Sequence, residues 1–323
     1  MPASTPHDVV RRLMARLKMR HLRLLLHIGE HGSLTRVAEH MATSQPAVTS
    51  ALAELENMFG VALFTRSARG MTPTPAGKVA LARARAMLND LDHLVSDMDA
   101  IASGHAAHLH IGVLPFVAGK IVSTAIQHTL DLGLRLTVRV DEGTSGQLLP
   151  RLRNHALDLV IGRVSASLDI DNIDFEVLYQ QRPRLIASRR LAARLGRHRL
   201  DWTMLAELDW ILGAPRTPMR EQIVELFLRA GVRPPTPIVE SYSSKLIGEL
   251  IVGSDSVVSI VPAEIAEELV RIAGVSIVPY SFDWTLSPVT LFTRTGGIQR
   301  DVDTVFKTAL RKVCEDANFT MSI

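Results

Sequence analysis

SLTRVAEHMATSQPAVTSALAELENMFG, residues 33–60, decides how the N-terminal part of this chain folds. Ser33 can cap a first helix, whose apolar residues recur at spacings of three and four (Leu34, Val37, Ala38 and Met41). Ala42 and Thr43 then form a turn. Ser44 can cap a second helix, and Pro46 falls in its first turn, where the missing N–H would have no intrahelical partner anyway. The pattern predicts two short helices joined by a tight turn.

The second of these helices separates an apolar face from a polar one. Its predicted buried stripe recurs at helical spacing (Val48, Leu52, Leu55 and Phe59), which leaves Gln45, Thr49 and Ser50 facing outward near its start. An amide and two small hydroxyls suit base edges, because Gln can bond adenine twice and Ser or Thr can bond either a base or a phosphate. This is the arrangement of a recognition helix in a helix-turn-helix.

The same residues carry a family resemblance. SQPAVTSALAELENMFGVALFTR (44–66) followed by MTPTPAGKVAL (71–81) resembles the signature of LysR-type transcriptional regulators. RHLRLLLHIGEHGS (20–33) and the pattern of the second lobe resemble the subgroup of galactose-binding-protein and protocatechuate regulators. The resemblance implies a multidomain chain, with an all-α winged helix-turn-helix, a long linker helix and an α/β two-lobed periplasmic-binding-protein-like domain. It also implies a homotetramer that acts on RNA polymerase.

Charge is distributed unevenly along the chain. Residues 1–85 hold 12 Lys or Arg against 5 Asp or Glu, a balance of +7, whereas residues 86–323 hold 24 against 28, a balance of −4. A basic N-terminal part carrying a helix-turn-helix is expected of a domain that binds phosphates, tethered here to a nearly neutral ligand domain. The alternative is that these basic residues only solvate a small domain.

Length and composition predict a soluble protein of two or three domains. The 323 residues are 47% hydrophobic and 21% charged, and no apolar run approaches a membrane span of roughly 20 residues. The first 17 residues have no apolar secretion segment, and we interpret them as a frayed extension rather than as a transit peptide. The single Cys314 cannot form an intramolecular disulfide, so we expect a reducing compartment, the cytoplasm.

The winged domain is expected over residues 18–74. A first helix spans 18–30, and the segment VALFTRSARGMTPT (61–74) predicts two short strands around a basic turn. Arg66 and Arg69 can reach phosphate or the minor groove there, although each could equally be a solvated turn residue. We assign the DNA contacts to Thr35, Ser44, Gln45, Pro46, Thr49, Ser50, Arg66 and Arg69. The partner is double-stranded DNA.

Residues 75–103 predict one long helix. Apolar residues recur there every seven positions in two interleaved series, Leu81, Leu88, Val95 and Ala84, Leu91, Met98. A core helix could show the same stripe, but a helix this long would expose it in a monomer, so we expect dimerisation. The assigned contacts are Leu81, Leu88, Leu91, Val95 and Met98. Two recognition helices in a homodimer or homotetramer would then bind an interrupted palindrome.

The effector-binding domain is expected over residues 104–323. Nine apolar strands alternate with helices, a pattern typical of mostly parallel sheets covered on both faces. Nine strands are too many for one small sheet. We therefore expect two lobes, 108–170 with 284–323 and 178–280, and two crossings of the chain between them. A cleft between such lobes can bind a small molecule and close.

The effector site is expected in the loops at the carboxyl ends of strands. Helix N-termini converge there, which favours a small anion or polyhydroxylated ligand such as an organic acid, an aromatic carboxylate or a sugar acid. Each Ser or Thr could instead only cap its helix. The assigned residues are Leu114, Pro115, Phe116, Thr144, Ser145, Arg216, Thr217, Ser243 and Ser244. The resemblance implies that Thr144 or Ser145, and Ser243 or Ser244, contact the effector.

Catalytic motifs are absent from the sequence. It contains no HExxH, CxxC, P-loop, GxGxxG or GxSxG pattern, so we expect neither an enzyme nor a cofactor. His105, His108 and His110 form the one tight histidine group along the chain, and we interpret them as hinge and strand-edge residues rather than as metal ligands. The expected function is effector-controlled, sequence-specific DNA binding. The alternatives are a small-molecule binding protein and an effector-independent repressor.

Overall fold

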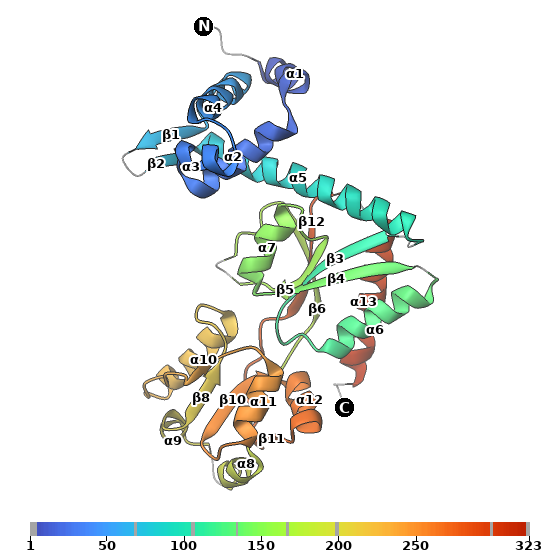
Figure 1. The fold of residues 1–323 in the computed structure, drawn as a ribbon. Helices are drawn as coiled ribbons and strands as arrows, with labels where there is room; N and C mark the ends of the chain where they lie inside the picture. Colours follow the sequence, from blue (N-terminus) through green and yellow to red (C-terminus); the bar gives the residue numbers. More distant parts are fainter. Residues whose placement is uncertain are drawn as a thin grey trace. The chain divides into compact units, whose positions relative to one another are not determined.

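The computed structural model describes residues 5–67, 70–104, 107–133, 135–165, 168–197, 200–297 and 300–320 (Figure 1). The chain divides into two compact units, residues 1–99 with 153–156, and residues 100–152 with 157–323. Among the described residues, no helix has both the length and the apolar character needed to span a membrane.

The N-terminal unit contains the predicted helix pair. Its helices are α1 (Pro6–Arg16), α2 (Met19–His31), α3 (Leu34–His40) and α4 (Gln45–Phe59), followed by β1 (Phe64–Ser67), β2 (Gly70–Pro73) and the long α5 (Pro75–Ala102). The strands β1 and β2 pair antiparallel, as predicted for the wing. The stripe from α4 packs with Leu25 and Ile28 of α2 and Val37 of α3 into one core.

Two expectations for this unit are wrong. The first residues are not a frayed extension, because α1 forms there with Thr5 as N-cap, accepting from the Asp8 N–H, and packs against α4. On α4, Met58 is buried to 2% exposure whereas Phe59 is only partly buried. The added helix α1 gives α4 a third neighbour besides α2 and α3, so its buried face is wider than a single stripe.

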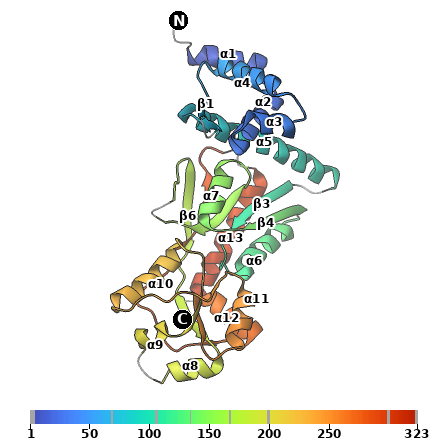
Figure 2. The same cartoon turned by 60° about the vertical axis from the view of Figure 1, so that its left-hand side comes forward.

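The first lobe of the second unit is built on a five-stranded sheet of order β4-β3-β5-β12-β6. The strands are β3 (Ala107–Val113), β4 (Leu136–Glu142), β5 (Leu159–Arg163), β6 (Ile173–Tyr179) and β12 (Val289–Arg294). Helices α6 (Gly119–Asp131) and α13 (Asp301–Thr320) pack together against one face, as Figure 2 shows. The shorter α7 (Ser145–Arg153) covers the other face.

The second lobe has its own five-stranded sheet of order β11-β7-β10-β8-β9. Its strands are β7 (Pro183–Ala187), β8 (Asp209–Leu212), β9 (Val239–Glu240), β10 (Val257–Pro262) and β11 (Ser276–Ile277). On one face lie α8 (Arg189–Leu195), α9 (Trp202–Ala206) and α10 (Pro218–Arg229) around Trp210 and Phe227. On the other lie α11 (Ser244–Val252) and α12 (Ala263–Ala273).

The two lobes and the two crossings are confirmed, but the sheets differ from the expectation in two ways. Both are mixed rather than mostly parallel, because β12 runs antiparallel to its neighbours in one sheet and β7 in the other. The sequence analysis also missed β6, so the first lobe extends to Tyr179 rather than to residue 170. This is an edge strand, and exposed Phe175 and Val177 interrupt the usual alternation of buried and polar residues.

Candidate functional sites

The start of α4 presents the predicted polar group. Ser44 caps the helix by accepting from the Ala47 N–H over 3.4 Å. Thr49 and Ser50 are exposed and Gln45 is half-buried. The Gln45 Nε2 donates to Thr49 Oγ1 over 2.9 Å, and Thr49 Oγ1 donates to the Gln45 carbonyl over 3.0 Å. The amide is therefore held in place on the helix surface while its oxygen stays able to accept a further bond.

The other residues assigned to DNA lie on the same unit's surface. Thr35 on α3, Ser44 and Pro46 at the start of α4, and Arg66 on β1 are all exposed. Arg69 lies outside the described residues. The turn between α3 and α4 is fixed by Ala42, which has φ of +49°, and by a 2.9 Å bond from the Thr43 N–H to the Ala38 carbonyl.

The wing is tied to both of its neighbouring helices. The carboxylate of Glu56 on α4 accepts from the N–H groups of Leu63 and Phe64 over 2.7 and 3.2 Å. Thr74 Oγ1 accepts from the Gly77 N–H over 3.0 Å as α5 begins. A Cβ at Gly77 would lie 1.9 Å from the Leu63 carbonyl oxygen, so only glycine fits there. These contacts give a physical reason for Glu56 and for Thr74 and Gly77, which all belong to the stretches that resemble the family signature.

The assigned seam on α5 is divided between two environments. Leu81 and Leu88 pack against the core of their own unit, and Ala84 is buried in it. Both leucines are only partly buried, so their assignment to the dimer contacts stays a prediction. Leu91, Val95 and Met98 are exposed, to 38, 58 and 63%, and with Leu94 and Ile101 they leave an apolar surface on the second half of the helix.

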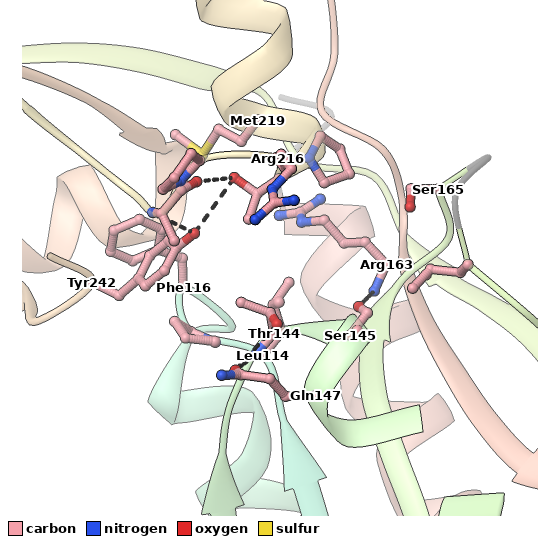
Figure 3. Close-up of a pocket in the computed structure, with 17 residues that line it drawn as sticks. Leu114, Phe116, Thr144, Ser145, Gln147, Arg163, Ser165, Arg216, Met219 and Tyr242 are labelled. Atoms are coloured by element: carbon pink, nitrogen blue, oxygen red, sulfur yellow. Dashed lines mark hydrogen bonds between the residues drawn. The ribbon is translucent and has the colours of Figure 1, made fainter. Parts of the chain in front are cut away.

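A cavity of about 400 Å³ lies between the two lobes of the second unit (Figure 3). Seven of the nine residues assigned to the effector line it: Leu114, Pro115, Phe116, Thr144, Ser145, Arg216 and Thr217. Leu114, Pro115 and Phe116 follow β3, and Thr144 and Ser145 begin α7 after β4. The other lobe contributes Arg216 and Thr217 before α10, so both lobes supply the wall.

Arg163 at the end of β5 is a lining residue that the sequence analysis missed. Its N–H donates to Ser145 Oγ over 2.9 Å. Its guanidinium is bonded to the Ser287 carbonyl and to Gln181 Oε1. Burial lowers the pKa of Arg163 to about 10, so the side chain keeps its positive charge at neutral pH. A basic residue directly after the buried strand LDLVIG was the signal that could have identified it.

The second lobe presents a hydroxyl network to the cavity. Tyr242 accepts from the Ala214 N–H over 3.0 Å and lies 3.5 Å from Thr217 Oγ1, which itself donates to the Ala214 carbonyl. The Tyr242 ring meets the ring of Phe116 edge to face, with centroids 5.5 Å apart. A Cβ at Gly213 would come within 2.3 Å of the Tyr242 ring, which explains a glycine at that position.

Two residues in the cavity wall have strained backbones. Phe116 and Arg216 have φ of +69° and +61°, in the left-handed region that residues with a Cβ rarely adopt. Such strain typically costs on the order of 1–3 kcal/mol and collects at binding sites. Arg216 is exposed, and no hydrogen bond or ion pair to its guanidinium occurs within the part of the chain that the structure describes.

Ser243 and Ser244 do not line this cavity. They line a neighbouring pocket, which shares Leu114, Pro115, Phe116 and Tyr242 with it. Ser243 is the N-cap of α11 and accepts from the Leu246 N–H over 3.3 Å, the capping role that the sequence left open. By contrast, Ser145 bonds across to Arg163, and Thr217 makes no capping bond through its side chain.

The histidines on β3 have structural partners. His110 is buried, not at a strand edge as expected, and its Nε2 lies 2.9 Å from Asp141 Oδ2. The His108 carbonyl accepts from Arg300. His105 lies outside the described residues. Burial lowers the pKa of His110. The neighbouring Asp141 carboxylate acts in the opposite direction, but its effect is smaller.

Comparisons with known proteins cover nearly the whole chain. Residues 19–78 match the bacterial regulatory helix-turn-helix protein, lysR family, and residues 102–315 match the LysR substrate binding domain. The chain is 29% identical to the regulator GbpR of Azospirillum brasilense, over 87% of this chain and 82% of that protein. It is 30% identical to PcaQ of Agrobacterium fabrum, over 86% and 89%. These relatives confirm the family and the subgroup predicted from the sequence.

Solved structures agree on the fold. Full-length CbnR in complex with its target DNA matches with a TM-score of 0.60 and 20% identity, covering 92% of this chain and all of that one. A full-length OxyR variant from Pseudomonas aeruginosa matches with a TM-score of 0.58 and 19% identity, covering 92% and 98%. At these identities the likeness shows the fold alone: a helix-turn-helix domain followed by a two-lobed α/β domain.

Proposed function

Because this chain belongs to the LysR family of bacterial regulatory helix-turn-helix proteins, we propose that it is a DNA-binding transcriptional regulator controlled by a small carboxylate bound between the lobes of its second unit. Reading of base edges is assigned to Gln45, Thr49 and Ser50, and phosphate contacts to Arg66. The polar and basic character of the N-terminal unit supports these roles, since phosphate contacts position a protein on DNA and base contacts select the sequence.

The observation that supports an anionic effector is the electrostatics of the cavity wall. The guanidinium of Arg163 is buried there, Arg216 offers another cation, and none of the described lining residues is Asp or Glu. The first turns of α7 and α10 also begin at the wall, and the N–H groups of a first turn have no intrahelical partner. A ligand with one negative charge is favoured by all of these groups.

The rest of the wall favours a ligand with an apolar body. Phe116, Tyr242, Leu114, Leu168 and Met219 line it, and a cavity of this size suits a compact molecule. We therefore place aromatic and other cyclic carboxylates before sugar acids. The hydroxyls of Thr144, Ser145 and Thr217 would orient the carboxylate or a ring hydroxyl.

Binding is proposed to act through the relative position of the lobes. A ligand that contacts both Ser145 and Thr217 bonds better to one arrangement of the lobes than to another, which is the condition for a population shift. Two chains joined along α5, in a homodimer or a homotetramer, would transmit this shift to the spacing of two recognition helices on an interrupted palindrome. The same proposal includes an effect of the bound regulator on RNA polymerase and a location of the regulator in the cytoplasm.

Catalysis is not favoured by the groups around the cavity. Its described lining residues include no Asp, Glu, His, Cys or Lys, so a general base is missing from the described wall. The hydroxyl of Ser145 is bonded to a backbone N–H rather than to an imidazole.

The test measures DNA binding and ligand binding separately. Fluorescence anisotropy of the full chain with the flanking intergenic DNA should give tighter binding than with random DNA of equal length at moderate salt. In calorimetry, benzoate-type carboxylates should bind to the full chain, whereas the matched carboxamides should not bind. Selective DNA binding without any response to carboxylates would instead favour an effector-independent repressor, and ligand binding without DNA selectivity a small-molecule binding protein.

A further inference from the structure

Three histidines meet between two helices of the N-terminal unit. His27 and His31 lie one turn apart near the end of α2, and His40 is the last residue of α3. One ring nitrogen of each lies within 4.8 Å of the others. The ring centroids are 5.9 Å apart for His27 and His31, 4.6 Å for His27 and His40, and 5.1 Å for His31 and His40.

Two ring nitrogens of this group lack hydrogen-bond partners among the described residues. His27 Nδ1 and His31 Nε2 are buried without a hydrogen bond in the described part of the chain. The acid beside the group is Glu30, whose Oε2 is 4.0 Å from His27 Nδ1 and whose other oxygen accepts from Arg85 over 3.1 Å. Buried polar atoms are nearly always bonded, so two in one group of imidazoles need an explanation.

We propose that His27, His31 and His40 form a binding site for a divalent late first-row transition metal, with Zn²⁺ as the representative ion. Imidazole nitrogen is a preferred ligand of this class. Bonds of about 2.0–2.1 Å place tetrahedral ligand atoms about 3.3 Å apart. Closing from the observed separations requires only small side-chain rotations, because His40 is exposed and His31 is half-buried.

Three protein ligands leave a fourth coordination position. Water can fill it, since His40 lies at the surface. Glu30 lies three residues after His27 and directly before His31. The same three nitrogens could instead remain a packed aromatic group without metal, but that arrangement leaves the two buried nitrogens unbonded. A metal ligated through His27 Nδ1 and His31 Nε2 would account for both atoms.

The site would join the ends of two helices that both pack against α4, the proposed recognition helix. His31 is followed by Gly32, whose carbonyl accepts from the Met71 N–H of the wing over 2.7 Å. His40 is followed by the turn into α4. A metal bound here therefore links α2 to α3 beside both the wing and the recognition helix, and it stabilises the folded unit by binding the native arrangement only.

The experiment uses the full-length, tag-free chain dialysed against chelator. Zn²⁺ titrated in competition with a chromophoric chelator should bind at one site per chain, and Co²⁺ should give the visible absorption of a tetrahedral site. Saturating Zn²⁺ should raise the midpoint of thermal unfolding by about 5 °C. The exposed position of His40 makes His40→Gln the informative variant, and we expect it to weaken Zn²⁺ binding at least about 100-fold.

The control is His7→Gln, which removes an exposed histidine of α1 outside the group and should leave Zn²⁺ affinity unchanged. Both variants should unfold like the parent chain in chelator, so that a loss of binding reports lost ligation rather than misfolding. His31→Gln should reproduce the loss. Equal Zn²⁺ affinity in the parent chain and in His40→Gln, or the absence of a tetrahedral Co²⁺ spectrum, would overturn the proposal.

Discussion

Gln181 donates from its Nε2 to Glu264 Oε2 over 3.0 Å, where the chain first crosses between the lobes. The other end of the same amide accepts from the guanidinium of Arg163, a cavity residue. The Gln181 Nε2 also lies 3.3 Å from the carbonyl of Phe116, another cavity residue. Since Arg163 bonds Ser287 in the second crossing as well, these contacts connect the cavity to both crossings between the lobes.

Removing the amide should destabilise the effector-binding unit. Gln181→Leu would leave Arg163 and Glu264 without their shared partner in a fully buried place. We expect the free energy of unfolding to fall by about 2–4 kcal/mol, the usual cost of orphaned buried charged groups. Urea unfolding measures it. Gln127→Leu, on the exposed face of α6, is the control and should change stability by less than about 0.5 kcal/mol. Equal effects of the two changes would contradict the role given to Gln181.

The cation at the cavity mouth should determine ligand affinity. Arg216→Gln removes an exposed guanidinium that makes no bond to the described residues, so the fold should be unaffected. We expect carboxylate affinity to fall about tenfold to a hundredfold, as for loss of a charge-assisted hydrogen bond. Calorimetry measures this change. Arg229→Gln removes a cation from the far end of α10, where it pairs with Glu225, and should leave carboxylate affinity unchanged.

The buried His110 should make stability depend on pH. Burial lowers its pKa in the folded chain, so the unfolded chain takes up the proton first as pH falls. The free energy of unfolding should therefore decrease from pH 7 to pH 5. His110→Gln keeps a donor for Asp141 and should flatten this decrease, which urea titrations at several pH values can follow. His128→Gln on α6 is the control. A variant curve as steep as that of the parent chain would count against this assignment.

The second half of α5 should hold the dimer. Val95→Glu with Met98→Glu places two carboxylates on the exposed apolar surface, and analytical ultracentrifugation should show the smaller species at concentrations where the parent chain is a dimer or tetramer. Ala82→Glu is an exposed change on roughly the opposite face of the same helix, by the 3.6-residue period, and should leave assembly unchanged. Leu81 and Leu88 are unsuitable positions for this test, because they pack within their own unit.

Local chemistry is what made much of this fold predictable from sequence. The caps at Ser33 and Ser44, the stop at Gly60 and the paired wing strands all depend on residues near in sequence, and each was predicted correctly. The edge strand β6 was missed because its outer face carries Phe175 and Val177, which conceal the alternation. A heptad pattern does not say whether a stripe packs on its own chain or on another, so it did not predict that Leu81 and Leu88 contact the core of their own unit.

The sites were less predictable where distant segments meet. Loops at strand ends identified the seven assigned lining residues, but Gln147 and Ser165 needed the tertiary arrangement to enter the set. The group of His27, His31 and His40 escaped because only two of its members lie one turn apart, and the third comes from another helix. Sequence spacing indicated the group at His105, His108 and His110 instead, and there His110 is bonded to Asp141.

Substitutions of Gln45 and of Arg66 should affect DNA binding in different ways. Gln45→Ala removes the amide assigned to a base edge, so we expect about 1–3 kcal/mol less discrimination between operator and altered operators, with weak binding to random DNA nearly unchanged. Arg66→Ala removes a phosphate contact. It should weaken binding to all sequences and reduce the slope of log affinity against log salt by about one unit. Anisotropy titrations at several salt concentrations measure both quantities, and Arg11→Ala, an exposed change on α1, is the control. If both variants lost affinity equally on every sequence with the same salt slope, neither the amide nor the guanidinium would have the role assigned to it, because base contacts and phosphate contacts must differ in that respect.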